Sequence, residues 1–346
     1  MTIGVGVAGL ASYYSTYYAN RAMEHPDTTV AGGAQLDATD EQLEALGRYP
    51  KAEFGNVFAC PVYDSIDDLL AANDVDVVIL GSLLHRRADD AVAILDAGRP
   101  VLTGKPAAAS ASDAERIADA AREDNLVAAT TAPHRHDGRI QQAQKRVERG
   151  EIGDVCSIRA TVYHGMASPD GIEAKDGLAP DEPGPAYTMG YYTADLVRWF
   201  AGDRDPHAIT GSLENTNSPF MAHPDVGSAT VSFADTTIAT MTYAMCNAYG
   251  PGYGWEIEVH GTEGTIRTDQ RGHEGMQWSD TAGRTVELFG RTLDPVLDHQ
   301  FDRFISAVID ESGYDGVAPG PDEAAAGIAL CDAWVEAATS NQPITL

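Results

Sequence analysis

Short apolar runs alternate with longer amphipathic stretches over the first 130 residues. Continuous apolar runs of this length are typical of strands that are buried on both faces, and strand–helix alternation indicates a doubly wound parallel sheet. We therefore expect an α/β, Rossmann-type domain over residues 1–130. The strand-like runs are residues 3–10, 29–36, 75–81 and 100–103, and helix-like stretches follow the first and third of them at residues 11–20 and 86–97.

The pattern changes to period-2 alternation after residue 155. Alternation of this kind predicts an antiparallel or mixed sheet with one face on a core. We expect a second, α+β domain over residues 131–346, carrying a large mixed sheet and serving substrate binding and oligomerisation, with its last helix packing back on the first domain. The alternating runs are Cys156–His164, Ser228–Phe233, Thr237–Tyr243, Glu256–His260 and Thr265–Arg267, the expected helices are residues 294–310 and 321–339, and residues 165–185 form an acidic, proline-rich loop.

A glycine turn joins the first strand to the first helix. Strand, glycine turn and helix are the context that a dinucleotide-binding fingerprint requires. Gly9 takes the first glycine position, but Ala11 takes the second and Tyr14 the third. The bulk of Tyr14 predicts a helix that sits differently from the usual one. The segment Gly9-Leu10-Ala11-Ser12 is therefore a candidate for cofactor binding, and an ordinary strand–turn–helix start is the alternative.

Asp37 follows the second strand. An acid at this place accepts hydrogen bonds from a ribose 2′-hydroxyl and repels a 2′-phosphate, which favours NAD over NADP. The other interpretation is helix capping, because Asp37 and Thr39 both precede a helix-like stretch. The two roles are compatible.

Gly81-Ser82 and Gly104-Lys105 follow the third and fourth strands. Ligands bind at the carboxyl ends of strands in doubly wound sheets, where Gly9 and Asp37 also fall. Only four of the 23 basic residues are lysines, so a lysine at this place is a candidate for chemistry. A strand-end lysine that extends to water is the alternative.

These segments resemble the Gfo/Idh/MocA family, named after glucose–fructose oxidoreductase and inositol 2-dehydrogenase. The family's Glu-Lys-Pro corresponds to Gly104-Lys105-Pro106, so the lysine is kept and the acid is missing. A family histidine in the preceding helix falls on Arg87, two residues from His85. The resemblance continues through residues 132–137 and the bridge at 148–155, and it implies NAD as the cofactor.

Residues 187–202 resemble the family's catalytic helix, with Gly190, Asp195, Trp199 and Gly202 in register. Thr188 replaces the family's aspartate and Tyr192 its histidine. On one helix, Thr188, Tyr192 and Asp195 would share a face. An ammonium beside a phenol stabilises the phenolate, so Lys105 and Tyr192 could act together as acid and base. The alternative is an ordinary core stripe of Tyr192, Leu196 and Trp199.

Histidines and an arginine lie near the expected cleft. His134, Arg135 and His136 follow another predicted strand, and His164 ends the first strand of the second domain. We expect these four residues to contact substrate or cofactor, and Asp195 to contact substrate. For the four, hydrogen bonding between the domains is the alternative. His, Cys, Asp and Glu show no metal-ligand spacing, so no metal is expected.

The 346-residue chain has a formal net charge of −29 and 43% hydrophobic residues. Nucleic acid and anionic membranes are poor partners for such a surface. Many acids with few lysines suggest a halophilic protein whose surface charge is screened by salt. The four separate cysteines and the absence of a basic leader or a long apolar run indicate a cytoplasmic location.

The resemblance and the motifs together predict an NAD-dependent oxidoreductase. Its expected substrate is the hydroxyl or keto group of a sugar, sugar acid or cyclitol, and the resemblance suggests a homodimer or homotetramer. Because Gly104 and Thr188 depart from the family pattern, a lyase- or hydrolase-type enzyme that uses NAD without net oxidation remains open. A non-catalytic binding protein on the same scaffold is the third interpretation, because of Ala11 and Tyr14.

Overall fold

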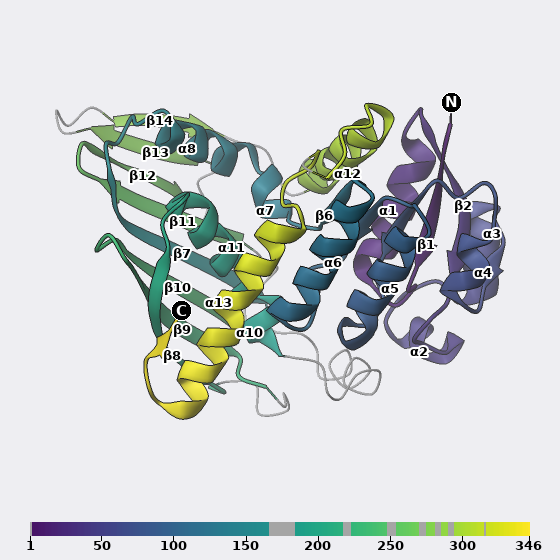
Figure 1. Cartoon of the computed structure of the whole chain (residues 1–346), viewed down its shortest axis with the longest axis horizontal. Coiled ribbons are helices and arrows are strands. Elements are labelled where there is room, and N and C mark those ends of the chain that lie inside the picture. The colour runs from purple at the N-terminus through teal and green to yellow at the C-terminus, as the bar shows by residue number, and fades with distance from the viewer. Residues whose placement is uncertain are drawn as a thin grey trace. The chain divides into compact units, whose positions relative to one another are not determined.

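The computed structural model describes residues 2–165, 184–216, 223–247, 254–269, 275–280, 285–289, 294–314 and 316–346. The chain divides into two compact units (Figure 1). Of the described residues, those up to residue 131 and those within 298–325 belong to unit 1. The described residues within 132–165, 184–297 and 326–346 belong to unit 2. Most of the predicted acidic loop at residues 165–185 lies outside the described residues.

Unit 1 is built on a six-stranded parallel sheet in the order β3-β2-β1-β4-β5-β6. This order is that of a doubly wound Rossmann sheet, so the predicted fold class of the first domain is confirmed. Its strands are β1 (Ile3–Ala8), β2 (Thr28–Ala34), β3 (Val62–Tyr63), β4 (Val77–Leu80), β5 (Val101–Thr103) and β6 (Ala128–Thr130).

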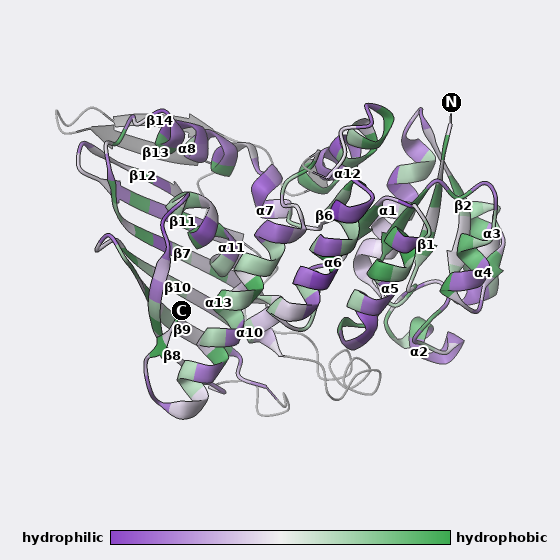
Figure 2. Cartoon of the chain, viewed as in Figure 1, coloured by the Kyte–Doolittle hydropathy of each residue, from purple (hydrophilic) through white to green (hydrophobic). Residues whose placement is uncertain are grey.

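The helices of unit 1 begin and end where local chemistry requires. Ser12, Ser65 and Ser110 cap α1, α4 and α6 by accepting a backbone hydrogen bond, and Gly98 adopts a positive φ just after α5. Figure 2 shows hydrophilic and hydrophobic bands around α6, which buries one alanine-rich face. These helices are α1 (Tyr13–Glu24), α2 (Asp40–Ala45), α3 (Lys51–Phe58), α4 (Ile66–Leu70), α5 (Leu84–Asp96) and α6 (Ala111–Glu123).

Unit 2 contains a nine-stranded mixed sheet in the order β14-β13-β12-β11-β7-β10-β9-β8-β15. β7 and β10 run parallel, and the other neighbours run antiparallel. The expected mixed sheet is therefore confirmed. Its strands are β7 (Val155–Gly165), β8 (Pro206–Glu214), β9 (Val226–Phe233), β10 (Ile238–Asn247), β11 (Gly254–Gly261), β12 (Gly264–Asp269), β13 (Gly275–Asp280), β14 (Thr285–Phe289) and β15 (Ile344–Thr345).

The helix α11 packs on β7 and β10 and is buried along most of its length. Trp334 of α13 lies against Gly190, Gly211 and Gly227, where an added Cβ would come within 2.6–3.1 Å of its ring. These contacts give unit 2 its core on one face of the sheet. The remaining helices are α7 (Pro133–His136), α8 (Gly138–Glu148), α10 (Pro185–Thr188), α11 (Gly190–Ala201), α12 (Asp294–Ile309) and α13 (Pro321–Ser340).

The single helix expected across residues 187–202 forms as two helices. α10 ends at Thr188, and Met189 separates it from α11. Met189 has φ −109°, away from regular helical geometry, and Tyr192 donates a hydrogen bond back to its carbonyl over only three residues. Thr188 therefore lies at the end of α10, whereas Tyr192 and Asp195 lie on α11.

Candidate functional site

The carboxyl edge of the unit 1 sheet brings the predicted cofactor residues together. Backbone amides of the loop residues continue the ladder beyond the strands: Gly9 donates to Ala34, Gly81 to Ala8, and Gly104 to Leu80, at 2.7–2.9 Å. Each of the loops after β1, β4 and β5 is therefore hydrogen-bonded to the end of a neighbouring strand, and the three loops lie along one edge of the sheet. Lys105 lies two residues beyond β5, is half-buried, and precedes Pro106 through a cis peptide bond.

The glycine turn approaches the loop after β4 closely. Gly9 has φ +80°, and a Cβ there would overlap the backbone of Ser82. A Cβ on Gly81 would lie 2.5 Å from the Cβ of Ser12 and would overlap the Ser15 hydroxyl. Close contact between the helix and the sheet therefore comes from Gly81 rather than from the third fingerprint position. Tyr14 stays half-buried on α1, and its ring stacks on Tyr18.

Ser15 is a site residue that the motif search missed. It is fully buried, and its hydroxyl donates a 2.7 Å hydrogen bond to the carbonyl of Gly9. Ser12 is the N-cap of α1, which positions the helix start behind the turn. A backbone–side-chain bond of this kind leaves no motif in the sequence, because any small hydroxyl residue one turn into a helix could make it.

The Ser82 hydroxyl has no hydrogen-bond partner among the described residues, although Ser82 is fully buried. An unsatisfied buried polar atom costs stability unless a ligand or water binds it. Its position beside Gly9 at the carboxyl edge fits a bound dinucleotide. Leu10 is buried and Ala11 half-buried in the same turn.

Asp37 is enclosed by the loop after β4. Its side chain is 5% exposed and accepts hydrogen bonds from the backbone N–H of Leu83 at 2.9 Å and from Arg86 at 3.0 Å. Each carboxylate oxygen retains a second lone pair, so a ribose hydroxyl is still compatible with Asp37. The N-cap of α2 is Thr39 rather than Asp37, and Thr39 forms a capping box with Gln42.

Arg86 itself is held by two acids. It donates hydrogen bonds to Asp90 as well as to Asp37, and these bonds, those to Asp90 above all, raise the pKa of its guanidinium. Asp90 is 6% exposed, so the pair is partly shielded from solvent. The sequence interpretation named Arg87 and His85 in this helix but not Arg86.

In unit 2, three predicted substrate residues bind one another. The carboxylate of Asp195 accepts hydrogen bonds from Arg135 at 2.7 and 2.8 Å and contacts His134 Nε2 at 2.5 Å. All three side chains are 3% exposed or less. Burial alone would raise the pKa of Asp195, but Arg135 and His134 outweigh it and hold that pKa well below its usual range.

Aromatic rings surround this cluster. Tyr192 is 1% exposed, with its ring edge-on to His134 at 5.1 Å and 5.9 Å from Trp255. The guanidinium of Arg135 lies 4.8 Å from the Trp199 ring centre, a cation–π distance. Of the expected core stripe, Tyr192 and Leu196 are buried, whereas Trp199 has intermediate exposure.

A second ion pair adjoins the cluster along the chain. Asp137 caps α8 through the N–H of Arg139, binds the Arg139 side chain, and accepts a 3.3 Å hydrogen bond from Trp255 Nε1. His136 is also buried. His164 lies in β7, and its side chain is outside the described part of the chain.

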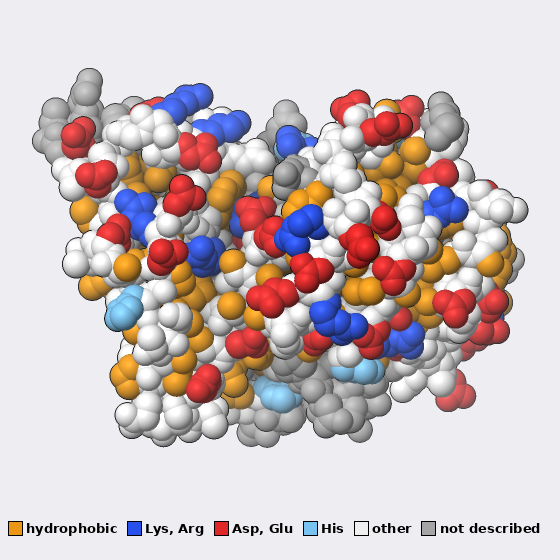
Figure 3. Space-filling model, in the orientation of Figure 1, with side chains coloured by type: hydrophobic (Ala, Val, Ile, Leu, Met, Phe, Trp, Pro, Cys, Tyr) orange, Lys and Arg blue, Asp and Glu red, His pale blue; other side chains and the backbone are white. Residues whose placement is uncertain are grey.

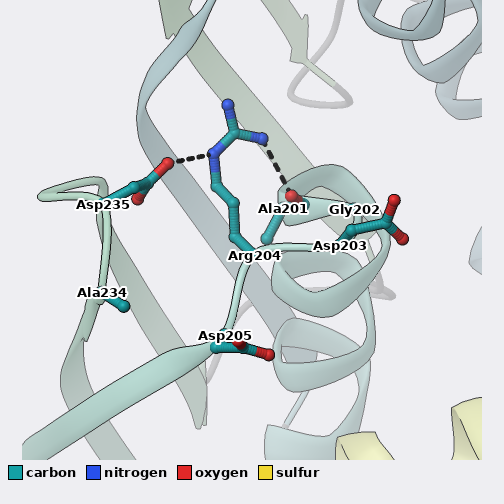
Figure 4. A pocket seen from close by; sticks show the side chains of 7 residues that line it. All are labelled: Ala201, Gly202, Asp203, Arg204, Asp205, Ala234 and Asp235. Atoms are coloured by element: carbon teal, nitrogen blue, oxygen red, sulfur yellow. Dashed lines mark hydrogen bonds and ion pairs between the residues drawn. The ribbon is translucent and has the colours of Figure 1, made fainter.

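One surface pocket lies elsewhere in unit 2 (Figure 4). Its lining contains Asp203 and Asp205, and Arg204 bonds to Asp235 and to the carbonyl of Ala201. No predicted site residue lines it. Among the described residues, no group of three or more His, Cys, Asp or Glu could hold a metal ion. In the same residues, no helix combines the length and apolarity needed to span a membrane.

Two family models match successive parts of the chain. Residues 3–131 match an oxidoreductase family with an NAD-binding Rossmann fold, and residues 140–267 match a GFO/IDH/MocA C-terminal domain. The chain belongs to the Gfo/Idh/MocA family. Unit 1 accordingly carries the family's NAD-binding domain, as the sequence predicted, and the family is one of oxidoreductases.

Curated relatives are distant. The chain is 23% identical to inositol 2-dehydrogenase of Rhizobium meliloti over the full length of both proteins. It is 28% identical to dTDP-3,4-didehydro-2,6-dideoxy-alpha-D-glucose 3-reductase of Streptomyces violaceoruber, over 62% of this chain and 60% of that enzyme. The match with the reductase therefore spans less than two thirds of its length.

Solved structures share the fold. Levoglucosan dehydrogenase in complex with NADH and levoglucosan aligns with a TM-score of 0.83 at 19% identity, covering 100% of this chain and 99% of that one. A myo-inositol dehydrogenase structure from Sinorhizobium meliloti aligns at 0.77 with 20% identity, covering 99% of both chains. At these identities the likeness shows the fold alone.

Proposed function

We propose that the protein is an NAD-dependent dehydrogenase or reductase that acts on a hydroxyl or keto group of a sugar, sugar acid or cyclitol. The substrate class follows the relatives, whose names specify inositol, levoglucosan and a deoxysugar nucleotide. The observation that carries the proposal is the carboxyl edge of the unit 1 sheet, where the Gly9 turn, the buried Ser82 hydroxyl and Lys105 follow neighbouring strands.

The residues of this edge suit a dinucleotide. When bound, the nicotinamide would accept or donate the hydride. Gly9 and the N-terminus of α1 offer a close backbone approach and a positive helix end for the pyrophosphate. Asp37 would accept hydrogen bonds from the ribose, which favours NAD, and the Ser82 hydroxyl would gain the partner it lacks among the described residues.

Lys105 is the proposed catalytic residue of unit 1. In the oxidation direction, the carbinol C–H bond breaks with its electron pair and the hydroxyl loses a proton to a base, which leaves a carbonyl, NADH and a proton. The Lys105 ammonium would hydrogen-bond the substrate oxygen and stabilise its developing negative charge. Tyr192 remains the candidate base, with Thr188 as a hydrogen-bond donor or acceptor to substrate.

A substrate panel tests the proposal. Polyols, aldoses, aldonates and cyclitols, including myo-inositol and levoglucosan, are incubated with NAD in molar KCl, and NADH is followed by absorbance. We expect turnover with at least one compound and a loss of about 10²–10⁴-fold in Lys105→Met. Lys51→Met, which removes the half-buried lysine paired with Asp64, is the matched control. Equal turnover by Lys105→Met would reject the role of Lys105.

The panel also separates the two alternatives. An enzyme that uses NAD without net oxidation would consume substrate while the total NADH stays constant. A binding protein would leave every compound unchanged. Thr188 and Gly104 motivate this comparison, because each stands where the family carries an acid.

A further inference from the structure

Arg87 joins the two loops that carry Ser82 and Lys105. It is 8% exposed, projects from α5, and donates to the carbonyl of Ser82 from Nε at 3.0 Å and from Nη2 at 2.6 Å. Its Nη1 donates to the carbonyl of Pro106 at 2.5 Å. One guanidinium therefore ties the loop after β4 to the loop after β5.

The shape of the guanidinium suits this task. Arginine presents five N–H donors in a planar fork, whereas a lysine ammonium is a single point on a flexible stem. Pro106 has no N–H of its own, so its carbonyl is the only backbone hydrogen-bonding group it offers to the loop. Arg87 binds backbone carbonyls of the two loops, those of Ser82 and Pro106, rather than the Ser82 side chain.

Gly104 lies directly against this guanidinium. A Cβ on Gly104 would sit 3.5 Å from Cζ of Arg87 and 3.6 Å from each Nη. These are ordinary contact distances for a methyl group, but a longer side chain in that direction would meet the guanidinium. The resemblance noted in the sequence places position 104 where the family carries glutamate and position 87 where it carries histidine. The two departures from the family pattern are therefore in contact.

We propose that Arg87 is a positioning residue for Lys105 and Ser82, and that Arg87 and Gly104 together replace the family's histidine and acid. The inference rests on the proposed function, because that function gives Lys105 and Ser82 their roles. It explains how the chain keeps the lysine at the strand end after losing the neighbouring acid. It also predicts that restoring the family residue at position 87 or at position 104 alone impairs the enzyme.

The test uses four variants of the full chain in molar KCl. Arg87→Lys keeps the charge and removes the fork, Arg87→His and Gly104→Glu each restore one family residue, and the double variant restores both. Arg116→Lys is the matched control, since Arg116 is a half-exposed arginine on α6 that pairs with Asp89 and Asp113. Three readouts are taken: deuterium exchange of the 101–108 segment, NADH affinity by calorimetry, and kcat and KM for the best substrate of the panel.

Arg87→Lys should exchange the 101–108 amides about tenfold faster than the wild type. It should lower kcat about 10²-fold, with substrate KM changed much less, because a shift of about 1 Å at Lys105 misaligns the reacting groups. NADH affinity should fall severalfold through Ser82. Arg116→Lys should leave all three readouts unchanged. A general loss of folding would instead accelerate exchange across the whole of unit 1.

The double variant decides the coupling. Arg87→His and Gly104→Glu should each be impaired, and their combination should recover most of the lost kcat and loop protection. Losses that multiply in the double variant, or an Arg87→Lys variant equal to the wild type, would overturn the inference. Deuterium exchange needs no ligand. It therefore decides the role of Arg87 even if the wild type oxidises nothing in the panel, an outcome that would count against the proposed function alone.

Discussion

The buried carboxylate of Asp195 has its charge balanced by two neighbours rather than by solvent. Arg135 binds both of its oxygens, and His134 approaches one of them. The pKa of Asp195 lies below its unfolded value near 3.9, so its ionised form favours the folded state. This stability is present above the unfolded pKa, and it is lost as pH falls towards the lower folded pKa.

Asp195→Asn should destabilise unit 2 by about 3–5 kcal/mol, because the substitution leaves a buried guanidinium without its counter-charge. Urea unfolding at neutral pH and high salt measures the loss. Asp235→Asn is the matched control, since Asp235 pairs with Arg204 at the surface and should matter far less. The difference between the two variants should shrink as pH falls below about 4, because the Asp195 carboxylate of the unfolded chain then takes up a proton while that of the folded chain stays ionised. Equal effects of the two substitutions would contradict a charge-balancing role.

Ser82→Ala separates a ligand-binding hydroxyl from a structural one. The hydroxyl has no partner among the described residues, so its removal should leave stability unchanged or raise it. NAD affinity, measured by calorimetry, should fall about three- to tenfold. Thr131→Val should instead lower stability and leave NAD affinity unchanged, because the Thr131 hydroxyl already donates a hydrogen bond to the carbonyl of Thr103 at 2.8 Å. Unchanged NAD affinity in Ser82→Ala would remove Ser82 from the cofactor site.

The residues that sequence reasoning placed well are those at strand ends. Gly9, Ser82 and Lys105 follow apolar runs, and in a parallel sheet such positions share one edge. The contacts of Arg87 and Ser15 could not be predicted from the sequence. They depend on side chains that reach backbone carbonyls of other loops, and a single sequence does not reveal such pairings. The bond between Asp195 and His134 likewise joins residues 61 positions apart.

At the scale of elements, the start of α1 depends on the two glycines of neighbouring loops. Gly9 turns the chain at φ +80°, and Gly81 leaves room for Ser12 and Ser15. The helix is then fixed to α12 within unit 1: Arg21 forms a bidentate pair with Asp302, and Tyr17 donates to Asp298. A displaced α1 would move the helix end that faces the proposed pyrophosphate site.

Gly81→Ala should therefore lower stability by about 1–3 kcal/mol, because the new methyl group collides with Ser12 and Ser15. NAD affinity should drop more than in Ser82→Ala, since the whole helix start shifts. Gly138→Ala is the control: Gly138 lies at the exposed start of α8 with no atom within 4 Å of a new Cβ, and alanine there should be neutral or stabilising. Wild-type NAD binding by Gly81→Ala would contradict the proposed packing.

Elements with strong patterns were predicted, and weak ones were missed. β4 is buried at all four residues, and its apolar run identified it. β8 buries only Ile209 fully among nine residues, so its sequence shows little of the periodicity that marks a strand. The break at Met189 was also missed, because the pattern of apolar and polar residues along the sequence continues across this one residue without interruption.

For the whole molecule, charge is the dominant property. The formal net charge is −29, and acidic side chains are spread over the face shown in Figure 3 rather than gathered in one patch. Mutual repulsion of this kind destabilises a compact state when salt is low. The thermal midpoint should therefore fall by several degrees or more between molar and millimolar KCl. An unchanged midpoint would reject the halophilic interpretation of the composition.

The transfer of hydride at a site that contains Lys105 is the central claim. The most direct measurement uses the best substrate of the panel, deuterated at the oxidised carbon, in a single turnover with wild type and Lys105→Met, both saturated with NAD. The account predicts one deuteron at C4 of the nicotinamide for each molecule of product, and transfer slowed by about 10²–10⁴-fold in the variant. Product formed without label in NADH, or equal rates in the two proteins, would contradict it.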